Sequence, residues 1–200
     1  MAEALLHPVE PTLTMPPQEA DLLRERYAAT DVILEYGSGG STVLAASLPG
    51  RVVQSVESDA AWAQSLGRWF DANPPLREVR LHHADIGPTR RWGQPEGQAS
   101  WASFHAYPLG VWDREDFIHP DLVLIDGRFR AACFLATLFR IERPVTVLWD
   151  DYEGRPAYHE VERYARPSRM CGRMAVFDLV PMTVPARDLA WIMSVFTRTK

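Results

Sequence analysis

The chain has 200 residues, of which 46% are hydrophobic and 24% are charged, and its formal net charge is −5. This length fits one domain, and the composition is that of an ordinary globular protein, which excludes disordered, collagen-like and disulfide-scaffold chains. The negative charge argues against broad binding to nucleic-acid phosphates. The longest apolar stretches are only as long as strands, so we expect a cytoplasmic protein with no membrane partner.

Lysine and cysteine usage limits the chemistry further. The single lysine is Lys200, which excludes a phosphate-loop lysine and a Schiff-base lysine. Cys133 and Cys171 lack metal-ligand spacing, and we expect both to be reduced thiols that pack in the fold.

The elements follow one another in a regular order. Residues 1–17 contain four prolines and are predicted to form an irregular arm. Residues 18–29 have apolar side chains at helical spacing and predict a helix. Short apolar runs then alternate with helix-like stretches. The runs predict strands at 32–34, 52–56, 79–83, 122–125 and 145–149, and the stretches predict helices at 41–48, 59–72 and 130–141.

This alternation predicts a single α/β domain over residues 1–200, with a mostly parallel sheet and helices on both of its faces. The last part of the chain differs. Segments 174–180 and 190–197 are predicted to be two strands joined by a proline-containing turn, and we expect them to form an antiparallel hairpin that closes the sheet.

The segment most informative about function is residues 32–42, VILEYGSGGST, where a buried strand turns into a helix through glycines. Glycine permits positive φ and the close approach of a ligand, and open α/β sheets bind ligands at such turns. We predict that Ser41 is the N-cap of the following helix. A dinucleotide site would need a glycine at Thr42, so that match is partial.

Acidic residues follow the ends of the predicted strands, so one edge of the sheet is expected to be negative. These residues are Glu35, Glu57, Asp59, Asp85, Asp126, Asp150 and Asp151, with Arg128 the nearest cation in sequence. Two like charges about 4 Å apart cost on the order of 4 kcal/mol at an effective dielectric of 20. A pyrophosphate would be repelled there. A ligand that carries an ammonium and a sulfonium group, as S-adenosylmethionine does, would be held.

From residue 31 to 151 the sequence resembles class I S-adenosylmethionine-dependent methyltransferases. The resemblance rests on Glu35, Gly37 and Gly39, an acid followed by alternating glycines, with Ser41 where a third glycine is common. It implies a Rossmann-like fold with seven strands, the last of them antiparallel. The segments DLVLIDGRFRAACF and VTVLWDDYEGRPAYHEV are similar to poorly characterised bacterial members, which name no substrate.

The resemblance also implies a cofactor site. In it, Glu57 binds both ribose hydroxyls and Asp85 reaches the adenine amino group, while Ile86 packs on the ring. The predicted cofactor-binding set is Glu35, Gly37, Ser38, Gly39, Ser41, Thr42, Glu57, Ser58, Asp85, Ile86 and Asp126.

Methyl transfer depends mainly on orientation and on exclusion of water, so few catalytic groups are needed. The catalytic candidates are Asp126, as general base, and Asp150. A carboxylate at position 126 can equally cap the next helix or bind backbone amides. Together with Asp151, these two also resemble the magnesium set of catechol-type O-methyltransferases, but acids are common at strand ends, and our prediction includes no metal site.

Two other segments are candidates for acceptor binding. Residues 87–120 form a connection of 34 residues with six aromatic side chains, which is either a lid or a crossover whose aromatics pack on the sheet. We expect most of them to pack and one or two to line the pocket. Arg155, Tyr158, His159 and Arg163 lie at helical spacing and can bind an anionic acceptor, although neighbouring glutamates favour a solvated helix face.

The sequence therefore predicts a methyltransferase that uses S-adenosylmethionine and acts on a small-molecule acceptor, with no nucleic-acid partner. Two alternatives stay open. One is a protein that binds S-adenosylmethionine without catalysis. The other is an NAD-dependent oxidoreductase, which the negative edge of the sheet disfavours.

Overall fold

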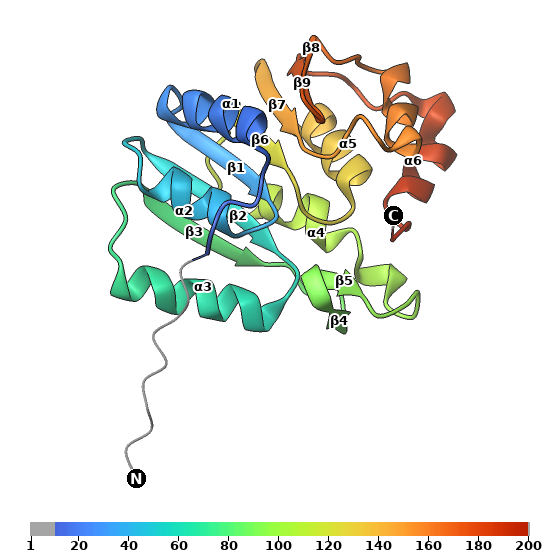
Figure 1. The fold of residues 1–200 in the computed structure, drawn as a ribbon. Coiled ribbons are helices and arrows are strands. Elements are labelled where there is room, and N and C mark those ends of the chain that lie inside the picture. The colour runs from blue at the N-terminus through green and yellow to red at the C-terminus, as the bar shows by residue number, and fades with distance from the viewer. Residues whose placement is uncertain (1–10, 200) are drawn as a thin grey trace.

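The computed structural model describes residues 11–199. Its main sheet has seven strands in the order β3-β2-β1-β6-β7-β9-β8 (Figure 1). The parallel strands are β1 (Val32–Tyr36), β2 (Val52–Glu57), β3 (Glu78–His83), β6 (Leu122–Ile125) and β7 (Val145–Trp149). The antiparallel strands are β8 (Arg169–Cys171) and β9 (Met174–Leu179). The predicted Rossmann-like class, mostly parallel with an antiparallel hairpin, is confirmed.

Helices cover both faces of this sheet. The α-helices are α1 (Pro17–Ala28), α2 (Gly40–Ala46), α3 (Ala60–Ala72), α4 (Ala106–Leu109), α5 (Arg130–Arg140) and α6 (Leu189–Val195). The 3-10 helices are η1 (Arg91–Gly93), η2 (Trp101–Ser103), η3 (Gly110–Asp113), η4 (Pro156–Arg163) and η5 (Ala186–Asp188). Successive residues of β1 point to opposite faces, so Ile33 packs with α1 while Leu34 belongs to the cluster that contains α5. Burial on both faces explains the continuous apolar runs in these strands.

The closing hairpin lies elsewhere than predicted. It is formed by β8 and β9, which meet at Gly172, a residue with φ of +53°. The prediction of a strand at 190–197 is wrong, because most of this segment forms α6. Ile192 and Val195 are buried while Met193 is exposed, and this spacing of three is helical. A short apolar run does not distinguish a strand from a buried helix.

The start of α2 also differs from the prediction. The helix begins at Gly40, and Gly39 is at the N-cap position, so Ser41 lies inside the first turn and is not the cap. The hydroxyl of Thr42 accepts a hydrogen bond from the Gly39 N–H at 2.9 Å. The N–H of the N-cap residue Gly39 is therefore satisfied by a side chain of the first helical turn, that of Thr42.

The amino-terminal arm crosses the beginning of α2. Residues 11–16 form neither helix nor strand, as expected, and residues 1–10 of the predicted arm lie outside the described residues. A Cβ atom at Gly40 would overlap the peptide between Thr12 and Leu13, and Met15 is buried. Gly40 is thus needed for packing of the arm. None of the helices between residues 11 and 199 combines the length and apolarity needed to traverse a lipid bilayer.

We expect Gly40→Ala to loosen the arm, because the added methyl group occupies the space of the 12–13 peptide. Overpacking of this kind costs about 1–3 kcal/mol. Hydrogen exchange at residues 12–15 and thermal unfolding measure the effect. Gly154→Ala is the matched control, since a Cβ there meets no described atom within 4 Å. Equal exchange in both variants would show that the arm does not depend on this contact.

Candidate functional site

The loops after β1 and β6 meet backbone to backbone. Gly37 has φ of +104°, and its N–H donates to the Val56 carbonyl at 2.9 Å. A Cβ on Gly37 would lie 2.8 Å from the Cα of Gly127. Two glycines at this contact allow the loops to approach as no pair of larger residues could. The loops form one side of a cavity at the carboxyl ends of the parallel strands.

This first cavity has a volume of about 510 Å³. Small-molecule sites have volumes of about 300–1,000 Å³. Its other walls come from arm residues 11–15, from Trp92 and Tyr107, and from carboxylates at the ends of β2 and β6. From the predicted cofactor set, the lining includes Gly37, Ser38, Gly39, Ser41, Glu57 and Asp126.

Glu57 is held in place by the backbone around it. Its carboxylate accepts N–H donors from Ser58 at 2.7 Å, Asp59 at 2.8 Å and Ser38 at 3.4 Å. The residue is only 8% exposed, and burial raises the pKa of Glu57, while these N–H groups act in the opposite direction. A carboxylate fixed in this way is preorganised to accept further hydrogen bonds from a ligand.

Asp126 faces the same cavity from the end of β6, and its side chain remains 32% exposed. One carboxylate oxygen accepts from Arg130 Nη2 at 3.0 Å. Loss of hydration raises the pKa of Asp126 to about 7, although Arg130 acts to lower it. The helix-cap alternative does not apply, because α5 begins at Arg130 after Phe129, whose φ is +50°.

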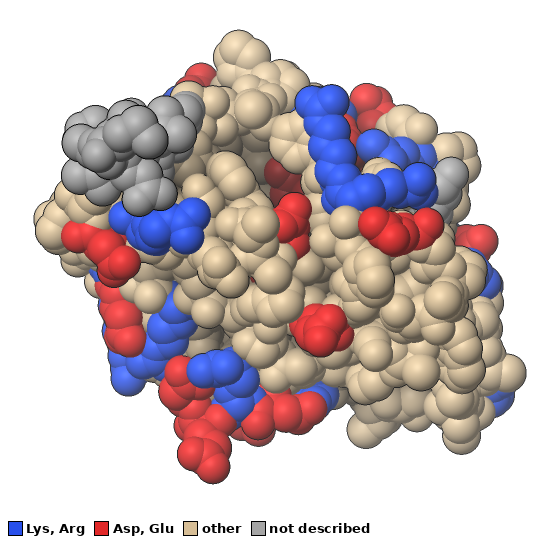
Figure 2. Space-filling view, turned by 90° about the horizontal axis from the view of Figure 1, so that it is seen from below, with Lys and Arg blue, Asp and Glu red and all other residues tan. Residues whose placement is uncertain are grey.

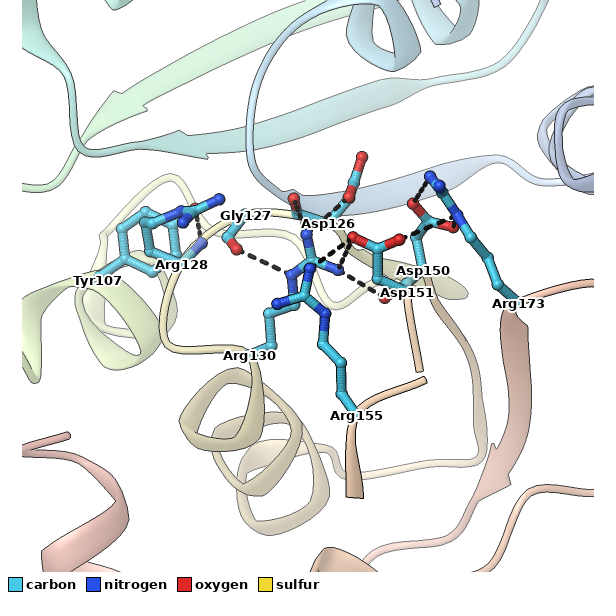
Figure 3. A network of polar contacts seen from close by, with 9 residues as sticks. All are labelled: Tyr107, Asp126, Gly127, Arg128, Arg130, Asp150, Asp151, Arg155 and Arg173. Atoms are coloured by element: carbon cyan, nitrogen blue, oxygen red, sulfur yellow. Dashed lines mark hydrogen bonds and ion pairs between the residues drawn. The ribbon is translucent and has the colours of Figure 1, made fainter. Parts of the chain in front are cut away.

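The next carboxylates bind arginines (Figure 3). Asp150 is buried and pairs with Arg173 at 2.7 Å. Asp151 contacts Arg173 at 3.0 Å and Arg155 at 3.1 Å. Guanidinium groups therefore occupy the positions between these acids, and among residues 11–199 no three acidic, histidine or cysteine side chains are grouped to hold a metal. The magnesium-set alternative does not fit this arrangement.

Comparison with solved structures identifies the family. A methyltransferase-like protein from Silicibacter pomeroyi DSS-3 is 52% identical, with a TM-score of 0.91, over 94% of this chain and 98% of that one. The chain belongs to the class I S-adenosylmethionine-dependent methyltransferase superfamily. A scan against protein-family models gave no match, and neither did a search of curated proteins.

More distant methyltransferases share the fold. The O-methyltransferase TomG from Streptomyces achromogenes is 16% identical, with a TM-score of 0.53, over 85% of this chain and 82% of that one. A methyltransferase from Geobacter sulfurreducens is 14% identical, with a TM-score of 0.54, over 83% of this chain and 80% of that one. At these identities the likeness concerns the fold alone.

In this member of the superfamily, the acid of the glycine motif lies behind the turn. Glu35 is fully buried and accepts hydrogen bonds from Tyr27 at 2.6 Å, Thr42 at 2.6 Å and Ser55 at 3.1 Å. Thr42 in turn accepts the Gly39 N–H. Glu35 therefore links α1, α2 and β2 through hydrogen bonds and stabilises the glycine turn from its buried side.

The other predicted cofactor residues are dispersed. Asp85 is exposed and accepts the Gly87 N–H at 2.9 Å, while Ile86 is part of the core. Ser58 donates its hydroxyl to the Gly93 carbonyl at 2.9 Å. These contacts fix the start of the 87–120 connection, and Asp85, Ile86 and Ser58 lie outside the lining of the first cavity.

Two residues from the 87–120 connection, not predicted individually, line the first cavity. These residues are Trp92 and Tyr107. The sequence analysis expected one or two aromatic residues of this connection to line the pocket, and two do so. Phe104 and Trp112 pack in the core, whereas Trp101 is 57% exposed. Nothing in the sequence pointed to the arm as a wall of the site, because its contact with Gly40 depends on how the chain returns across α2.

The expected negative edge is only partly present. Glu57, Asp59 and Asp126 line the first cavity, but Arg91 and Arg128 line it as well. The remaining strand-end acids are buried, turned to solvent or paired with arginines distant in sequence. Figure 2 shows acidic atoms within a hollow of one face and basic side chains beside it.

We expect Glu35→Ala to lower the free energy of unfolding by about 1–3 kcal/mol, because three buried hydroxyl groups lose a shared acceptor. Glu35→Gln keeps an acceptor oxygen and is expected to be milder. Equal destabilisation by both changes, in urea unfolding, would contradict the shared-acceptor role.

The same two proteins test the titration of this group. Burial raises the pKa of Glu35, so the native state keeps this proton to higher pH than the unfolded chain does. Wild-type stability is therefore expected to fall as pH rises from the ordinary glutamate pKa to the raised one. Glu35→Gln is expected to lose that part of the slope. Unfolding curves at a series of pH values provide the measurement.

Proposed function

We propose that this protein binds S-adenosylmethionine in the first cavity and transfers its methyl group to a small-molecule acceptor. The observation that carries the proposal is Glu57, a buried carboxylate fixed by three backbone N–H groups beside the glycine turn. Among the described residues, its Oε2 atom accepts only the long contact from Ser38 and can still accept a ribose hydroxyl. The structure of TomG is a complex with S-adenosylmethionine, which supports the same ligand here.

The charges in the cavity also fit this ligand. Glu57, Asp59 and Asp126 offer negative charge to the ammonium and sulfonium groups. Gly37 and Gly127, which are in close contact, both line the cavity and present backbone atoms to a ligand with no side chain in the way. Arg91 and Arg128 line the same cavity and offset part of this negative charge.

When bound, S-adenosylmethionine supplies an electrophilic methyl carbon: the acceptor atom bonds to it as the carbon–sulfur bond breaks, leaving S-adenosylhomocysteine. The protein has to orient the acceptor and exclude water. Trp92, Tyr107 and the arm cover the cavity for this purpose. Asp126 is the base for a hydroxyl or amine proton, because a pKa of about 7 suits proton transfer near neutral pH.

Glu57→Ala is expected to weaken binding of S-adenosylhomocysteine by about 10- to 100-fold, the value of hydrogen bonds to a charged acceptor. Isothermal titration calorimetry measures this. Glu25→Ala on the exposed face of α1 removes the same charge away from the site and is expected to bind as the wild type does. Unchanged affinity in the Glu57 variant, or thermal stabilisation by NAD but not by S-adenosylhomocysteine, would overturn the proposal.

The pH dependence of binding tests Asp126. Below pH 7 the carboxyl is largely neutral, and above it the carboxylate attracts the ammonium group of S-adenosylhomocysteine. Affinity is therefore expected to rise between pH 6 and pH 8, and a one-unit fall of this pKa on binding corresponds to about tenfold. Asp126→Asn is expected to flatten the profile. A slope that survives this substitution would assign the titration to another group.

A further inference from the structure

A second cavity of about 670 Å³ lies beside the first, and Trp92, Gly127 and Arg128 line both. Its other walls include the β4 (Thr89–Arg90) and β5 (Gln94–Pro95) hairpin and the start of η4. If the first cavity holds the methyl donor, as proposed above, then this neighbouring space is in reach of the transferred group. Its chemistry therefore indicates the class of acceptor.

The second cavity has an excess of positive charge. Four arginines line it, together with a single carboxylate, that of Asp151. Arg130 and Arg155 both contact this carboxylate, at 3.7 Å and 3.1 Å. Within residues 11–199, Arg90 and Arg128 form no ion pair. Two guanidinium groups, those of Arg90 and Arg128, are therefore without a carboxylate within 4 Å in the described part of the chain.

Arg128 is the more telling of the two, because its Nε atom is buried without a hydrogen-bond partner in the described part of the chain. Five buried side-chain atoms share that property, and among them only this one belongs to a residue that lines either cavity. In Figure 3 the contact drawn for Arg128 leaves from its backbone N–H, which donates to Tyr107. An unpaired buried donor is costly, and an anion bound at this boundary would give the Arg128 guanidinium a partner.

Backbone strain gathers at the same place. Trp92, Phe129 and Asp151 have φ of +66°, +50° and +55°, and they are the non-glycine residues with positive φ in the range 11–199. All three line the second cavity. Left-handed backbone at non-glycine residues is disfavoured and concentrates at functional sites.

We propose that the second cavity binds the methyl acceptor as an anion, a small molecule with a carboxylate or phosphate group and an apolar body. Arg128 binds the anionic group through its fork of N–H donors, and Arg90 adds charge at the entrance. Trp92 and Tyr158, whose ring lies under Arg155, pack against the apolar body. A cavity of this volume on a chain of net charge −5 suits a small anion better than a nucleic acid.

Ligand-observed NMR titrations test this with benzoate, phenyl phosphate and benzamide, the last being a neutral molecule of the same shape as benzoate. We expect both anions to bind, and benzamide to bind at least about tenfold more weakly. Arg128→Gln is expected to weaken benzoate by about tenfold or more, and Arg90→Gln, at an exposed position that leaves the core intact, by about two- to fivefold. Arg166→Gln, an exposed arginine away from both cavities, is the control.

Equal binding of benzamide and benzoate would overturn the proposal. So would equal losses in the Arg128 and Arg166 variants, or Arg128-dependent binding of a short single-stranded RNA without binding of the small anions. Thermal unfolding of each variant shows that it is folded. Titration of the same proteins with S-adenosylhomocysteine separates the two proposals. A protein that binds S-adenosylhomocysteine but does not bind benzoate contradicts the acceptor proposal. A protein that binds benzoate but does not bind S-adenosylhomocysteine contradicts the proposed function.

Discussion

Close approach of backbone to backbone is the constraint on which the site depends. The loops after β1 and β6 touch at Gly37 and Gly127, and the arm touches α2 at Gly40. A side chain at any of these positions would separate the segments and widen the cavity between them. The glycines of the turn therefore serve two purposes, since Gly37 brings two loops together while Gly40 admits the arm that covers them.

Pairing of charges divides the sheet edge into two regions. The first cavity is lined by the carboxylates of Glu57 and Asp126, of which Asp126 also contacts Arg130, whereas Asp150 and Asp151 are both bound by Arg173. Arg128 lies where the regions meet and lines both cavities. A cationic methyl donor on one side and an anionic acceptor on the other would attract each other across this boundary. The two proposals are thus electrostatically compatible, although each has its own test.

The local pattern was a good guide to the sheet and a poor guide to its closing segment. Strands such as β1 and β2 are buried on both faces, so their sequences are continuous apolar runs between polar turns. Segment 190–197 is also apolar, but it forms α6, because only packing against α5 decides which of its side chains are buried. The N-cap prediction for Ser41 failed because α2 begins at Gly40, which leaves Ser41 inside the first turn.

The sequence by itself determined the family, the glycine turn and the acids at the strand ends, because these features are encoded by residues close together in the chain. The tertiary structure decided which acids face a ligand. Arg173 pairs with Asp150 and Asp151, which leaves neither acid free for a ligand, and Glu35 is buried under the turn. Arg173 pairs with Asp150 across 23 residues of sequence, and an ion pair of this kind leaves no periodic or local signal in the sequence.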